Sequence, residues 1–130
     1  MWCKHRLQWF VLKNKNTTQK GREAEDFACA FLEKNHYKIL ECNFNTRFGE
    51  IDIIAQKGGI LHFVEVKSGI GFEPVYNLSP KKMQNLMQAL NIYLSKNHIK
   101  IPYCLSALIL SKKHIQEDFM VEWIENLTLF

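Results

Sequence analysis

Apolar residues recur at helical spacing in two segments of this 130-residue chain. Between Gly21 and Asn35, and again between Ser79 and Asn97, they fall three and four positions apart and form one stripe per segment. The stripes consist of Ala24, Phe27, Ala28, Phe31 and Leu32 in the first segment and Met83, Leu86, Met87, Leu90 and Tyr93 in the second. The pattern predicts two amphipathic helices. Thr17 or Thr18 is a candidate cap for the first helix, and Ser79-Pro80 is a start signal for the second.

Five other segments have the composition and the apolar pattern of β-strands. We expect strands at Tyr37–Asn45, Glu50–Lys57, Ile60–Lys67, Tyr103–Leu110 and Phe119–Ile124. Gly58 and Gly59 separate the second and third of them, which predicts a hairpin with a two-residue turn. Ser68–Leu78 is expected to be a loop that is mobile without substrate. The order α-β-β-β-α-β-β predicts an α/β fold, with a mixed β-sheet flanked by helices.

The predicted hairpin brings acidic residues together. A turn at Gly58-Gly59 places Asp52 directly opposite Glu65, and Glu50 opposite Lys67, on one face of the two strands. The other face is apolar and carries Ile51, Ile53, Ala55, Val64 and Val66, with His62 as its polar member. Two opposed carboxylates, with Cβ atoms about 5 Å apart, repel each other unless a shared proton, the Lys67 ammonium or a cation offsets their charge.

Mg²⁺ fits this pair of carboxylates best, because it is commonly held by one or two carboxylates together with waters and substrate phosphates. Lys67 could then reach the scissile phosphate or orient the attacking water. The alternative is that the acids and Lys67 form ordinary surface ion pairs, which contribute little to stability.

The charge of the chain is unevenly distributed, although its net value is only +4. Residues 1–20 contain five basic residues and no acid, and residues 74–116 contain six lysines and no acid. Such segregation is weak evidence for a polyanionic partner, because solvated lysines on a protein surface give the same pattern.

The four cysteines do not form a CxxC pair, so we expect small buried apolar side chains and no structural zinc site. No apolar run is long enough to span a membrane, and the N-terminal segment lacks the features of a secretory signal. The expected location is therefore the cytoplasm.

Three motifs together resemble a known family. They are Gly21-x-x-Ala24-Glu25-x-x-Ala28, Gly49-Glu50-Ile51-Asp52-Ile53-Ile54 and Phe63-Val64-Glu65-Val66-Lys67. From about Lys20 to the C-terminus the chain is similar to the YraN-type family of small bacterial proteins. That family belongs with the restriction-endonuclease-like PD-(D/E)XK nucleases, and its core layout is similar to that of archaeal Holliday junction resolvases.

The resemblance implies a role for each matching residue. Asp52 and Glu65 would be metal-binding acids for Mg²⁺ or Mn²⁺, with Glu25 completing the acidic cluster. Lys67 would be the catalytic lysine. Lys82, with its neighbour Lys81, would contact nucleic-acid phosphates, although a solvated lysine explains Lys82 equally well.

The chain also departs from the family pattern. Ala24 replaces a usual glycine, Ser68-Gly69 stands where many members carry a basic residue, and Ser106 stands where many carry an aspartate. The last difference puts one polar support of the site in doubt.

We therefore expect one nuclease-like domain at residues 17–130, preceded by a basic N-terminal extension at residues 1–16. The first hypothesis is a divalent-metal-dependent nuclease that hydrolyses phosphodiester bonds, with DNA as the favoured substrate and a homodimer suggested by the resolvase-like layout. The second is a non-catalytic nucleic-acid-binding domain that retains the fold. A third is an interaction module whose basic arm docks a protein partner.

Overall fold

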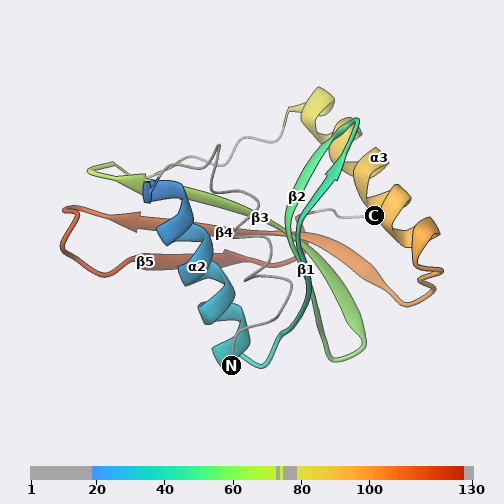
Figure 1. Ribbon diagram of the computed structural model, residues 1–130, viewed down its shortest axis with the longest axis horizontal. Helices are drawn as coiled ribbons and strands as arrows, with labels where there is room; N and C mark the ends of the chain where they lie inside the picture. Colours follow the sequence, from blue (N-terminus) through green and yellow to red (C-terminus); the bar gives the residue numbers. More distant parts are fainter. Residues whose placement is uncertain (1–18, 73, 75–78, 128–130) are drawn as a thin grey trace.

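The computed structural model describes residues 19–72, 74 and 79–127, and it has the predicted element order (Figure 1). The elements are α2 (Gln19–Lys34), β1 (Lys38–Thr46), β2 (Gly49–Lys57), β3 (Ile60–Ile70), α3 (Pro80–Lys96), β4 (Tyr103–Lys112) and β5 (Met120–Ile124). The expected basic extension at residues 1–16 and the cap at Thr17 or Thr18 lie outside the described residues. The α/β prediction is confirmed.

The strands form one mixed sheet in the order β1-β2-β3-β4-β5. β1, β2 and β3 are antiparallel neighbours, and β5 is antiparallel to β4. β3 and β4 are parallel, because α3 carries the chain back across the sheet between them. The turn between β2 and β3 has positive φ angles at Gly58 (59°) and Gly59 (76°), as a type I′ hairpin turn requires. The predicted two-residue hairpin is thus confirmed.

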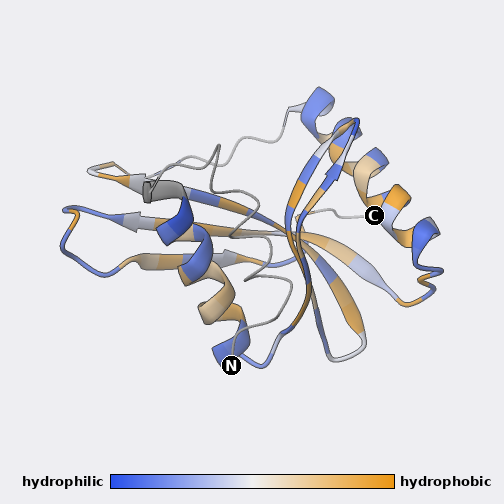
Figure 2. Ribbon diagram, in the orientation of Figure 1, coloured by the Kyte–Doolittle hydropathy of each residue, from blue (hydrophilic) through white to orange (hydrophobic). Residues whose placement is uncertain are grey.

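Each helix covers a different face of the sheet. α2 buries Ala24, Ala28 and Leu32 in one apolar cluster, and α3 buries Leu86, Leu90 and Tyr93 in the other. Both helices mix hydrophilic and hydrophobic residues along their length, as an amphipathic helix should (Figure 2). Ser79 caps α3, since its Oγ accepts a hydrogen bond from the Lys82 amide at 3.1 Å. None of the described helices is long and apolar enough to cross a membrane.

The hairpin of β1 and β2 changes face along its length. Cys42 and its partner Ile53 pack in the α2 cluster, whereas Phe44 and its partner Ile51 pack in the α3 cluster. Between these pairs Asn43 has a positive φ of 54°, which breaks the regular alternation of the strand. This end of the hairpin rises beside α3 (Figure 1). The expectation that Ile51 shares the core face of Ile53 is therefore wrong.

The predicted loop Ser68–Leu78 is shorter than expected, because β3 continues through Ile70 alongside β4. Gly69 is required at its place: a Cβ there would lie 2.9 Å from both the ring Cε2 and the carbonyl oxygen of Phe72. Residues 73 and 75–78 lie outside the described part of the chain, so the expected mobility of the loop stays a prediction.

Candidate active site

Asp52 lies where β2 separates from β3. The last Cα pair between the two strands is Ile53 with Val64, in the register that the hairpin predicts. Beyond it the backbone ladder stops, so Asp52 and Glu65 are not the directly opposed Cα pair that the hairpin predicts. Instead, the Asp52 Oδ2 atom accepts a hydrogen bond from the Val66 amide at 2.8 Å. A carboxylate thus takes the place of a backbone partner in the opening between the strands. This contact holds the Asp52 side chain beside β3 and not out in solvent.

Glu65 is buried on β3, with 7% of its surface exposed. Its Oε2 atom lies 3.6 Å from the Lys82 Nζ atom on α3. Burial raises the pKa of Glu65, while the positive charges of Lys82 and Lys67 oppose the rise. The structure therefore brings Glu65, Lys67 and Lys82 into electrostatic contact, as the candidate site requires.

The pKa of Asp52 is raised from 3.8 to about 8. Burial is the largest cause, and the negative charge of Glu65 is the next. The hydrogen bond from Val66 opposes the rise, whereas the charges of Glu50 and Glu25 add to it. Four carboxylates from α2, β2 and β3 therefore act on one region, and at neutral pH Asp52 retains a proton that an ordinary aspartate would lose.

The remaining predicted residues take distinct places. Glu25 is partly buried on α2, and its Oε2 atom is shielded from solvent. Lys67 is partly buried on β3, and Lys81 is exposed in the first turn of α3. Glu50 does not lie opposite Lys67, because the ladder between β2 and β3 ends at Ile53; its Cα partner is Asn45 on β1. That pairing expectation is wrong, although Glu50 still raises the pKa of Glu65.

The donor set suits a hard divalent cation. Carboxylate oxygens are the ligands that Mg²⁺ and Mn²⁺ prefer, and a cation would offset the repulsion that raises the pKa of Asp52. Among the residues that the structure describes, no three His, Cys, Asp or Glu side chains form a ready-made metal cluster. Asp52 and Glu65 nevertheless fit Mg²⁺, because this ion keeps several waters and needs only one or two protein carboxylates.

The lysine-rich segment 74–116 does not form one basic face. Lys112 is 4% exposed, and its Nζ atom lies 2.8 Å from Glu23 Oε1. Lys82 is engaged by Glu65. The charge segregation in the sequence therefore includes lysines with local partners.

A buried polar cluster around His62 could not be predicted from the sequence. His62 on β3 contacts Cys104 and Ser106 on β4, at 3.3 Å and 3.2 Å from its Nδ1 atom. These residues are 42 and 44 positions from His62, so no local motif marks them; the only signal was one histidine among apolar strand residues. Ser106 thus contacts His62 and is fully buried. The three cysteines that the structure describes are buried, as expected, and none of them forms a disulfide.

Comparison with known proteins agrees with the sequence motifs. The chain matches the model of the uncharacterised protein family UPF0102 over residues 24–115, a range that includes every candidate site residue. A UPF0102 protein of Helicobacter hepaticus is 49% identical over 88% of this chain and 98% of its own length. Relatives from Wolinella succinogenes and Helicobacter pylori are 50% and 41% identical over 85% and 90% of this chain, each over 96% of its own length. The expected YraN-type membership is confirmed, and the chain belongs to the family UPF0102.

Proposed function

We propose that this protein is a divalent-metal-dependent nuclease that hydrolyses phosphodiester bonds, with DNA as the favoured substrate. One observation carries the proposal: Asp52 and Glu65 are two acids with raised pKa values at the opening between β2 and β3, with Lys67 beside them. A structural ion pair has no need of several acids in one buried place, because their repulsion costs stability. Metal-dependent phosphodiester hydrolysis uses such a cluster to hold its cation.

Each side chain has a task in this proposal. Asp52 and Glu65 would hold Mg²⁺ or Mn²⁺, with Glu25 closing the acidic cluster from α2. The metal ion would supply an activated water and neutralise charge on the phosphate. The Val66 amide orients the Asp52 carboxylate, so one of its oxygens is fixed in advance. Lys67 would place its ammonium against a phosphate oxygen or the attacking water. Lys82 would exchange Glu65 for a substrate phosphate, assisted by exposed Lys81.

The alternative is a nucleic-acid-binding domain without catalysis. The ion pair of Lys82 with Glu65 favours it, because this ammonium already offsets part of the charge that a metal would neutralise. The two functions differ in what they require of Glu65: a nuclease needs its carboxylate, whereas a binding domain tolerates its loss.

The test is a cleavage assay on labelled linear, flap and four-way-junction DNA, and on RNA of the same linear sequence, with Mn²⁺ or with chelator. We expect cleavage that requires Mn²⁺ and is lost in both Glu65→Gln and Lys67→Ala. Glu122→Gln is the matched control, because Glu122 is an exposed acid on β5. Binding without cleavage across the panel would support the alternative. Cleavage that persists in Glu65→Gln would contradict the proposed site.

A further inference from the structure

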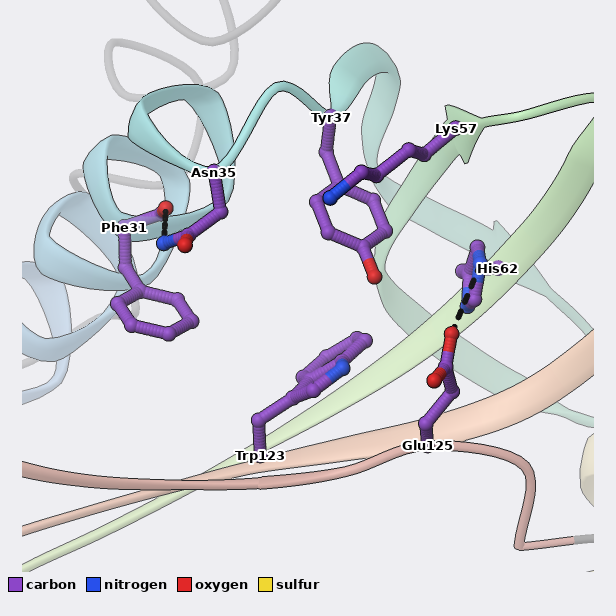
Figure 3. A pocket seen from close by; sticks show the side chains of 7 residues that line it. All are labelled: Phe31, Asn35, Tyr37, Lys57, His62, Trp123 and Glu125. Carbon is purple, nitrogen blue, oxygen red and sulfur yellow. Dashed lines mark hydrogen bonds and ion pairs between the residues drawn. The ribbon is translucent and has the colours of Figure 1, made fainter.

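A pocket of about 410 Å³ lies at the opposite end of α2 from Glu25. The ends of α2, β2 and β5 and the beginnings of β1 and β3 surround it. Its volume is in the range of small-molecule sites. Figure 3 shows Phe31 and Asn35 on the side of α2, and Trp123 and Glu125 reaching from the end of β5 toward a common space. None of the proposed nuclease residues lines it.

The walls of the pocket are aromatic. The rings of Tyr37 and Trp123 meet edge to face, with centroids 5.5 Å apart and an interplanar angle of 68°. Phe31 faces them from α2, and both Phe31 and Trp123 are only partly buried. Partly exposed aromatic rings around a hollow offer flat apolar surface on which a planar ligand stacks, as nucleic-acid bases do on proteins.

The polar end of the pocket is held by a buried network. The Glu125 carboxylate lies 3.8 Å from His62 Nε2, and Glu125 is 57% exposed. Behind it, His62 Nδ1 contacts the Ser106 Oγ atom at 3.2 Å. Ser106 Oγ also accepts a hydrogen bond from the Asn126 amide at 3.3 Å. The Nε2 atom of His62 faces the Glu125 carboxylate, which lies at the polar end of the pocket.

The charges at the pocket favour a ligand that is neutral beside Glu125 and anionic beside Lys57. The Lys57 Nζ atom lies 5.0 Å from the centre of the Tyr37 ring, on the opposite side of the pocket from Glu125. Burial lowers the pKa of His62, so the imidazole adds no charge at neutral pH. The Lys57 ammonium attracts an anionic group, whereas the Glu125 carboxylate requires a neutral group that donates hydrogen bonds to it. A neutral planar group attached to a phosphate satisfies both of them.

Hydrogen bonding to Glu125 selects among the bases. A carboxylate offers only acceptors, and it is best met by two adjacent donors. The Watson–Crick edge of guanine presents such a pair, the N1–H and the 2-amino group. Adenine and cytosine place a ring acceptor beside their single amino group, and uracil and thymine have one N–H between two carbonyls. In those bases an acceptor would face the carboxylate.

We propose that this pocket binds a guanine base, stacked on Trp123 and hydrogen-bonded through N1–H and the 2-amino group to Glu125, with Lys57 facing the phosphate. The base belongs either to a free guanine nucleotide or to a guanine in a single strand. The pocket has its own residues, so the proposal stands or fails apart from nuclease activity.

The test titrates the full-length protein with GMP, IMP and AMP in metal-free buffer with chelator, following the Trp123 indole resonance by NMR. IMP keeps the N1–H but lacks the 2-amino group. Since a good bidentate contact discriminates roughly tenfold or more between bases, we expect GMP to bind at least about tenfold tighter than AMP and severalfold tighter than IMP. Single-stranded oligonucleotides with one guanine or one inosine form the second arm.

Two variants test whether Glu125 is responsible for the preference for guanine. Glu125→Gln should abolish the preference for guanine while the protein stays folded, because this side chain is largely exposed. The matched control is Glu122→Gln, whose side chain alternates to the other face of β5, and it should bind like the wild type. Preference for GMP identifies a free nucleotide as ligand, and preference only in the oligonucleotide arm identifies a base in a strand. Equal binding of all bases, a preference that survives Glu125→Gln, or no binding in either arm would overturn the proposal.

Discussion

Asp52→Asn removes the ionisable group at the centre of the acidic cluster and keeps the size of the side chain. The asparagine oxygen can still accept the hydrogen bond that the Val66 amide donates at 2.8 Å. In the unfolded wild-type chain the pKa of Asp52 is 3.8, so this side chain loses its proton near pH 3.8. In the folded protein the pKa is about 8, so the proton is retained up to about pH 8. Between these values the native state binds more protons than the unfolded state, so wild-type stability falls as the pH rises.

The magnitude follows from the pKa shift. Each pKa unit corresponds to about 1.4 kcal/mol, and the rise from 3.8 to about 8 sets an upper limit of about 6 kcal/mol on the cost of ionising Asp52 in the folded state. Relaxation and water penetration reduce such costs, because the effective dielectric constant of a protein is well above that of its dry interior. We therefore expect the free energy of unfolding of Asp52→Asn to exceed that of the wild type by about 1–3 kcal/mol between pH 5 and pH 9.

The assay is equilibrium unfolding in urea with chelator and reductant, at pH 5, 7 and 9. The free energy of unfolding of Asp52→Asn should equal or exceed that of the wild type, and the difference should grow with pH. Asp118→Asn is the control, because Asp118 is an exposed aspartate outside the cluster, and it should show no such trend. If Asp52→Asn instead lost more than about 1 kcal/mol at pH 9, Asp52 would be a member of a structural ion pair and the reasoning would be refuted.

Three further predictions concern other residues. Lys112→Ala should lower the free energy of unfolding in urea by about 1–3 kcal/mol, because it removes a buried ammonium that forms an ion pair with Glu23. The control Lys113→Ala, at an exposed lysine, should change it by no more than about 0.5 kcal/mol, and equal losses in the two variants would contradict this prediction. Gly69→Ala should lower the free energy of unfolding by about 1–3 kcal/mol, because its Cβ would clash with Phe72. An unchanged urea midpoint would contradict this, because it would show that the backbone around Phe72 moves without cost. Lys82→Ala should weaken DNA binding and reduce the slope of log K against log salt concentration by about one, the value of one phosphate contact. The control Lys113→Ala should leave the slope unchanged. An unchanged slope in Lys82→Ala would show that Lys82 does not contact a phosphate.

Local patterns in the sequence are sufficient to predict most helices and strands of the fold. The Gly58-Gly59 turn and the alternation around it predict the register of β2 and β3 correctly as far as Ile53 and Val64. The predicted start of α3 at Ser79-Pro80 is also confirmed, because a cap and an N-terminal proline act within a few residues of each other. The helix and strand assignments depend on the same short-range periodicity.

Features that depend on distant packing could not be predicted. Periodicity does not reveal that the part of β2 before Ile53 is not paired with β3, where Ile51 packs in the α3 cluster and not with Ile53. The positive φ of Asn43, which turns Phe44 toward α3, has no distinct signal either. The proximity of Asp52 and Glu65 was predicted from a register that ends one pair before them, and the Val66 hydrogen bond that holds Asp52 had no signal in the sequence.

The most direct test of the acidic site is binding of Mn²⁺, measured by loss of the free-ion EPR signal at neutral pH. Wild-type protein should bind one Mn²⁺ per chain, and Asp52→Asn and Glu65→Gln should each abolish this binding. Glu122→Gln, the exposed control, should bind like the wild type. If the wild type bound no Mn²⁺, or if the two site variants bound it as the wild type does, the site would not be a metal centre.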